Sequence, residues 1–143
     1  MTTKKLLLIF TLPCVYTLLI FFLIPLTYRL FLPFIDISVE GPSMIALLKL
    51  GIPHAIGVFA AAIVTVVIIV KFINEKVYGL SLLAGLPIGI FTLVTALQYP
   101  EMNEGFTMKV GIKDALVMIV MPLLTMALLS RLSKLSKRQD SVS

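Results

Sequence analysis

EGPSMIALLKLGIPHA, residues 40–55, and EGFTMKVGIKDA, residues 104–115, are two copies of one pattern, and each stands at the start of a long apolar run. Both begin with Glu-Gly, reach a methionine and continue with Lys-x-Gly-Ile, and the first copy carries four extra residues, 45–48. The pattern indicates a unit of two apolar segments used twice. Its shared positions are Glu40, Gly41, Lys49 and Gly51 in the first copy, and Glu104, Gly105, Lys109 and Gly111 in the second.

The composition of the whole chain fits a membrane protein. Of its 143 residues 59% are hydrophobic and 13% are charged, which leaves too few polar groups to cover a soluble domain. Four runs approach the ~20 apolar residues that a helix needs to cross a bilayer, and they are continuous rather than alternating. We therefore expect an all-α polytopic protein, a single domain over residues 1–143. Its four spans are placed at about residues 6–27, 50–70, 77–98 and 110–130, with outer loops at 28–49 and 99–109 and a tail at 131–143.

The first and fourth spans need comment. Pro13 interrupts the first span, and we expect Pro25 to close it. The fourth apolar run, residues 115–130, would reach only about 24 Å as a helix, which is too short to cross. We therefore expect this helix to begin near Val110 and to continue past Ser130.

The basic residues are divided unequally between the two sides of the predicted bundle. Eight lie at the termini and in the loop between the second and third spans, and four lie in the other two connections. Cytoplasmic segments carry the excess of Lys and Arg, so both termini are predicted to be cytoplasmic. The location that this pattern favours is a bacterial inner membrane.

Rows of small residues, spaced four apart, mark two of the spans. The second span has Gly57, Ala61 and Thr65, and the third has Ser81, Gly85 and Gly89. Such rows let helix backbones approach closely, which drives packing in lipid. Because the loop between them is short, we expect spans two and three to be antiparallel neighbours that pack tightly, or one of them to pack on another subunit.

If the pattern reflects a true duplication, the two halves would be parallel repeats related by an axis along the membrane normal. Chance matching of apolar sequence is the alternative, and the sequence leaves both open. The alignment pairs His54 with Asp114, one turn inside the outer face.

A histidine beside a carboxylate can titrate near neutral pH and act as a proton-linked switch. The simpler interpretation is preferred: Asp114 suits a helix N-terminus on its own, and a lone histidine near the interface needs no partner. Pro13 and Pro87 also match, and paired broken spans can mark a substrate site. Again the plainer explanation is preferred, because prolines are common in membrane helices.

Other chemistry is sparse, and we predict no cofactor, no metal and no nucleic-acid partner. Cys14 is the only cysteine, which excludes an intramolecular disulfide. Met44, Met102, Met108 and His54 are soft ligands for copper(I), but they are spread over two loops and methionine is an ordinary apolar filler. No nucleophile stands beside an evident base, so no catalytic residue is assigned.

Three functional hypotheses follow. The first is a non-catalytic inner-membrane protein that acts by interaction, as an accessory subunit of a membrane complex or an immunity-type protein, with another membrane protein or a second copy of itself as partner. The second is a small oligomeric transporter or channel, with proton coupling as one option. The third is a membrane-embedded enzyme, which would need polar side chains clustered around a pocket.

Overall fold

The computed structural model describes residues 3–34, 44–73, 78–98 and 106–139, and all of these residues are helical. The elements are α1 (Thr3–Phe31), the short 3₁₀ helix η1 (Leu32–Phe34), α2 (Met44–Ile73), α3 (Tyr78–Gln98) and α4 (Phe106–Gln139). The all-helical prediction is confirmed.

The described residues contain four helical segments long and apolar enough to cross a membrane, and the first of them includes η1. These segments are Leu6–Phe34, Gly51–Phe72, Tyr78–Gln98 and Lys109–Leu132. Large apolar side chains point outward along all of them, among them Phe22, Phe91 and Leu124, with exposed fractions of 75%, 63% and 56%. An outer surface of this kind suits hydrocarbon and not water.

The helix ends differ from the sequence expectation in two places. Pro25 does not close the first span, because α1 continues to Phe31 with both of its prolines inside the helix. The helix α4 begins earlier than expected, at Phe106 rather than near Val110, and as predicted it runs on past Ser130, to Gln139. A helix tolerates an internal proline when tertiary contacts support the freed backbone groups.

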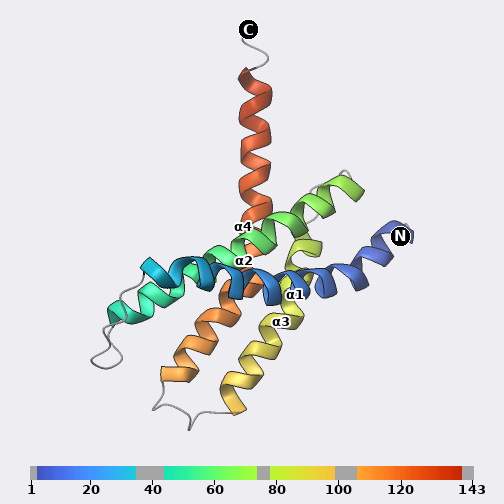
Figure 1. Ribbon diagram of the computed structural model, residues 1–143. Helices are drawn as coiled ribbons and strands as arrows, with labels where there is room; N and C mark the ends of the chain where they lie inside the picture. The colour runs from blue at the N-terminus through green and yellow to red at the C-terminus, as the bar shows by residue number, and fades with distance from the viewer. Residues whose placement is uncertain (1–2, 35–43, 74–77, 99–105, 140–143) are drawn as a thin grey trace.

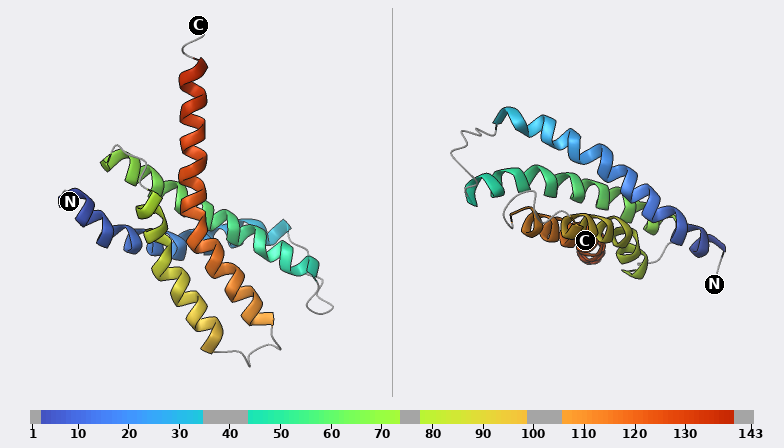
Figure 2. Two further views of the ribbon diagram at one scale, coloured as in Figure 1. Left: turned by 180° about the vertical axis from the view of Figure 1, so that it is seen from behind. Right: turned by 90° about the horizontal axis from the view of Figure 1, so that it is seen from below.

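The helices form two hairpins that cross each other (Figure 1). α1 packs along α2, α3 packs along α4, and across the hairpins α1 meets α3 while α2 meets α4. Figure 2 shows the same crossing from behind and from below, with the C-terminal part of α4 extending beyond the other helices.

The expected tight packing of spans two and three is therefore wrong, because α2 and α3 make only marginal contact. A short connection brings two helix ends together, but it does not force the rest of the helices to pack.

The core lies where the two hairpins cross. Tyr16 and Leu12 of α1 are fully buried there, together with Val58 and Ala61 of α2 and Met126 of α4. Ala84 of α3 joins the same cluster. The two hairpins therefore share one hydrophobic core.

Candidate functional site

A buried histidine and a partly buried aspartate face each other where α2 meets α4. His54 Nε2 lies 3.7 Å from Asp114 Oδ1, and the same oxygen lies 3.2 Å from Lys113 Nζ. Both His54 Nε2 and Asp114 Oδ1 are shielded from solvent, and among the described residues neither makes a hydrogen bond. Lys113 and Asp114 therefore form an ion pair, but the ammonium group is not oriented to donate a hydrogen bond to this carboxylate oxygen. The structure brings together the two residues that the repeat alignment pairs.

The cluster has a defined depth and a third helix beside it. Measured along their helices, His54 and Asp114 lie about 10 Å from the centres of their candidate spans, just inside a hydrocarbon half-thickness of about 15 Å. The third helix is α1, whose Thr27 hydroxyl donates at 2.8 Å to the carbonyl of Pro53, the residue before His54. Lys113 is half exposed, with 49% of its side chain accessible, so it can reach the interface as long basic side chains do.

The geometry gives the cluster a simple proton chemistry. With a neutral imidazole, Lys113 and Asp114 balance each other. A proton on His54 would make both imidazole nitrogens donors, and a closure of less than 1 Å would then form a charge-assisted hydrogen bond to Asp114. Such a bond would join one hairpin to the other. The described residues contain no group of three or more His, Cys, Asp or Glu side chains that could hold a metal ion.

The repeated pattern is only partly within the described residues. Glu40, Gly41, Glu104 and Gly105 lie outside them, whereas Lys49, Gly51, Lys109 and Gly111 lie within α2 and α4. A Cβ on Gly51 would lie 3.5 Å from Lys113 Nζ, and a Cβ on Gly111 would collide with Ala96 Cβ of α3. Gly111 therefore leaves room for α3, whereas at Gly51 a Cβ would make only an ordinary contact.

The small-residue rows pack helices within each hairpin. A Cβ on Gly85 would lie 2.5 Å from the Met118 carbonyl oxygen and 2.9 Å from Ile119 Cα, and one on Gly89 would collide with the Ile119 side chain. These glycines therefore bring α3 onto the backbone of α4. In the other hairpin, a Cβ on Gly57 would lie 2.9 Å from Ile24 Cα of α1. Ala61 and Ser81 are fully buried.

A second polar contact, which the sequence analysis missed, joins α1 to α4. Pro122 has no N–H, so the carbonyl of Met118 one turn earlier loses its usual helical donor. The fully buried Tyr16 donates its hydroxyl to that oxygen at 3.0 Å. Gly85 stands over the same carbonyl. The sequence signal was present, as a tyrosine in an apolar span and a proline within another, but the two are 102 positions apart.

Most described threonine hydroxyls are occupied within their own helices. Thr11, Thr65, Thr95 and Thr125 each donate to the carbonyl four residues earlier, at 2.8–3.0 Å. Thr27 differs, because its hydroxyl also lies 2.8 Å from the Pro53 carbonyl of α2. Back-bonded threonines are ordinary in membrane helices and do not make a polar path.

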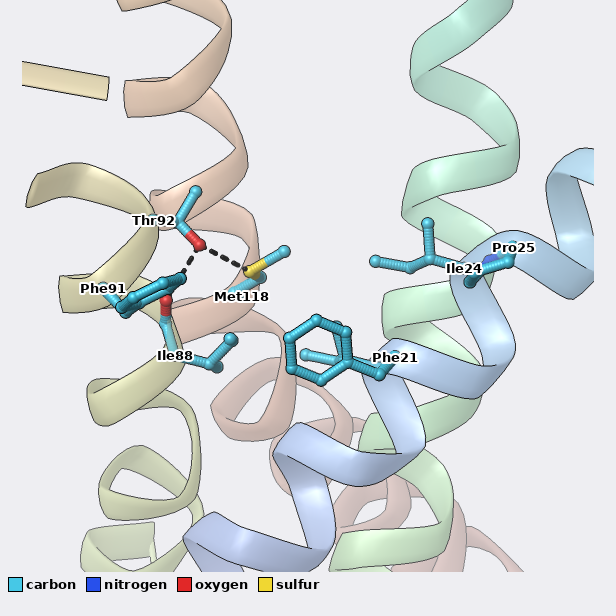
Figure 3. Close-up of a pocket in the computed structure, with 8 residues that line it drawn as sticks. Phe21, Ile24, Pro25, Ile88, Phe91, Thr92 and Met118 are labelled. Atoms are coloured by element: carbon cyan, nitrogen blue, oxygen red, sulfur yellow. Dashed lines mark hydrogen bonds between the residues drawn. The ribbon is translucent and has the colours of Figure 1, made fainter. Parts of the chain in front are cut away.

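A recess of about 240 Å³ opens on the outer surface between α1 and α3. Figure 3 shows Phe21 reaching from α1 toward the α3 side, with Ile88, Phe91 and Thr92 opposite and Met118 of α4 behind them. Thr92 donates to the Ile88 carbonyl at 2.8 Å and lies 3.5 Å from Met118 Sδ. The recess is thus apolar, and its one lining hydroxyl is already engaged.

Comparison with known proteins adds no relative: the chain matches no protein-family model, no curated protein and no solved structure.

Proposed function

We propose that this chain is a multi-pass protein of a bacterial inner membrane that acts without catalysis, by binding another membrane protein. The observation that carries the proposal is the uncovered face of α1. Only 22% of its most apolar window is buried inside the chain, against 33–39% for the other three spans. α1 is therefore the helix with the most surface left for a partner.

The uncovered face of α1 has the composition of a helix contact. Bulky side chains flank it, including Phe10 and Leu18, with exposed fractions of 71% and 58%. Between them stand two small exposed residues, Thr11 and Cys14, whose polar atoms turn back to the carbonyls of Leu7 and Phe10. Small residues between bulky ones let a second helix approach closely. The glycine rows of α2 and α3, by contrast, already serve contacts within the chain.

The class of partner follows from this arrangement. A helix face lying within the hydrocarbon would meet a transmembrane helix, as an accessory subunit meets its complex or an immunity-type protein meets its target. The His54–Asp114 cluster lies in the interior, between the hairpins, and would govern how they hold together rather than perform a reaction.

Affinity purification of the tagged protein from native membranes in mild detergent tests the proposal. We expect a second membrane protein in a fixed ratio to the chain. Thr11→Phe would place a bulky ring in the contact and cost about 1–3 kcal/mol, which would weaken partner binding roughly 5- to 150-fold and reduce its recovery accordingly.

Thr95→Phe is the matched control, because Thr95 is also exposed and back-bonded but lies on α3. It should leave recovery unchanged. Equal loss from both variants, or a preparation that contains only this chain, would contradict the proposal.

Orientation is a separate part of the proposal. From the excess of basic residues at both termini and between the second and third spans, we infer that these segments are cytoplasmic and that the segments containing Glu40 and Glu104 lie outside. A Cys14→Ser chain carrying a single cysteine at either glutamate should react with an impermeant thiol reagent in intact cells. Labelling only after the cells are opened would reverse the orientation.

A further inference from the structure

We infer that the recess between α1 and α3 is a binding site for a membrane phospholipid, which places one acyl chain in the recess and its anionic phosphodiester at Arg29. The inference stands apart from the proposed function, because it needs no protein partner. It rests on the depth of the recess, on its lining and on the cation at one end.

The recess lies at acyl-chain depth. Its α1 wall, Ile20 to Pro25, extends from the centre of the candidate span Leu6–Phe34 to about 7 Å beyond it. Its α3 wall, Ile88 to Thr92, covers the same range from the centre of Tyr78–Gln98. In a bilayer the surrounding medium at this depth is lipid chain.

The lining of the recess selects an apolar occupant. Seven of its eight lining residues are apolar, and the eighth, Thr92, already donates its proton to the Ile88 carbonyl. A water molecule needs two to four polar partners, which this lining does not supply. An unfilled space would forfeit the dispersion contacts of the surrounding side chains. A flexible hydrocarbon chain restores those contacts without requiring a partner group.

Arg29 supplies the charge that a headgroup requires. It lies four residues beyond Pro25, one turn farther along the same stripe of α1, and its side chain is exposed. Along the helix it is about 13 Å from the centre of the span, close to where the hydrocarbon ends and the phosphates begin. A guanidinium binds a phosphate oxygen pair through two parallel hydrogen bonds. A chain seated in the recess would therefore bring its own phosphate toward this cation.

The sequence permits a clean test, because it contains no tryptophan. Phe91→Trp places one fluorophore on the rim of the recess. The control is Leu124→Trp, which is exposed on α4 and lies at a matching distance, about 5 Å, from the centre of its span. Both variants are reconstituted into phosphatidylethanolamine vesicles that contain increasing fractions of phosphatidylglycerol brominated on its acyl chains. Bromine quenches tryptophan only on contact, so the curve reports which lipid occupies each position.

We expect Phe91→Trp to reach half-maximal quenching at a mole fraction about fivefold lower than Leu124→Trp, the preference that one cation gives an anionic lipid. Adding Arg29→Gln should bring the two curves to within twofold. Coincident curves in the original background, or weaker quenching at position 91 than at 124, would show that no lipid is selected there and overturn the site. An unchanged preference in Arg29→Gln would overturn the assignment of the headgroup contact.

Discussion

Replacing Tyr16 by Phe isolates one hydrogen bond at the crossing of the hairpins. The Tyr16 hydroxyl donates to the Met118 carbonyl at 3.0 Å in a fully buried position. Side-chain bonds between membrane helices contribute about 0.6 kcal/mol on average and up to about 1.7. The Met118 carbonyl is a special case, because Pro122 gives it no N–H, and a buried acceptor without a donor costs about 1–3 kcal/mol. We therefore expect Tyr16→Phe to lower the free energy of unfolding by about 1.5 kcal/mol.

The same reasoning predicts a dependence on Pro122. In the Pro122→Ala background the alanine N–H can donate to the Met118 carbonyl within α4. Tyr16→Phe should then cost about 0.5 kcal/mol, the ordinary value for an interhelical bond in lipid. The cost of Tyr16→Phe should thus differ by about 1 kcal/mol between the two backgrounds, and a double-mutant cycle measures this difference. The effect of Pro122→Ala on its own cancels in the cycle.

The assay is reversible unfolding in lipid–detergent micelles with increasing dodecyl sulfate, followed by near-ultraviolet circular dichroism. Thr11→Val serves as the control, because that hydroxyl is exposed and bonds only to its own helix, and it should change stability by less than about 0.5 kcal/mol. An equal cost of Tyr16→Phe in both backgrounds would refute the claim that Pro122 creates the acceptor.

Three further predictions concern helix packing and the polar cluster. Gly85→Ala should lower the free energy of unfolding by about 1–3 kcal/mol, because the added Cβ would collide with the backbone of α4. Gly79→Ala is the control: its Cβ would meet nothing within 4 Å, so the same unfolding assay should show no loss of stability or a gain. His54→Ala and Asp114→Asn should be non-additive by about 0.5–1 kcal/mol in the same unfolding assay, because two side chains that interact across 3.7 Å must couple; additive effects would exclude a working pair. Thr27→Val should cost about 0.6 kcal/mol through its lost contact with the Pro53 carbonyl, and no change in the unfolding midpoint would show that the contact is not used.

The spans were predictable because crossing a bilayer requires a length of apolar sequence that can be counted. The extension of α4 was predictable for the same reason, since residues 115–130 were too short alone. Which helices pack together was not predictable from connection length. Gly85 packs against the backbone of Met118 and Ile119, and Gly89 packs against the Ile119 side chain. The four-residue spacing of the glycines does not reveal which helix offers a matching surface.

The polar cluster was partly within reach of the sequence. Aligning the repeated pattern paired His54 with Asp114, and the structure places the two side chains 3.7 Å apart. Whether the two halves arose by duplication, and whether the pair acts as a switch, remain predictions. The sequence shows Tyr16 and Pro122, but it could not show that Tyr16 reaches the Met118 carbonyl, because that contact depends on how α1 crosses α4. The recess between α1 and α3 was likewise invisible, since its walls come from separate hairpins.

Site-specific photo-cross-linking in living cells tests the central claim, binding through α1, most directly. A photoreactive amino acid at Leu18 would lie on the uncovered face of α1, and one at Leu124 would lie on an equally exposed position of α4, with exposed fractions of 58% and 56%. We predict that Leu18 yields one discrete protein adduct and that Leu124 yields lipid adducts only. Lipid adducts alone at both positions, or the same protein adducts at both, would contradict the claim.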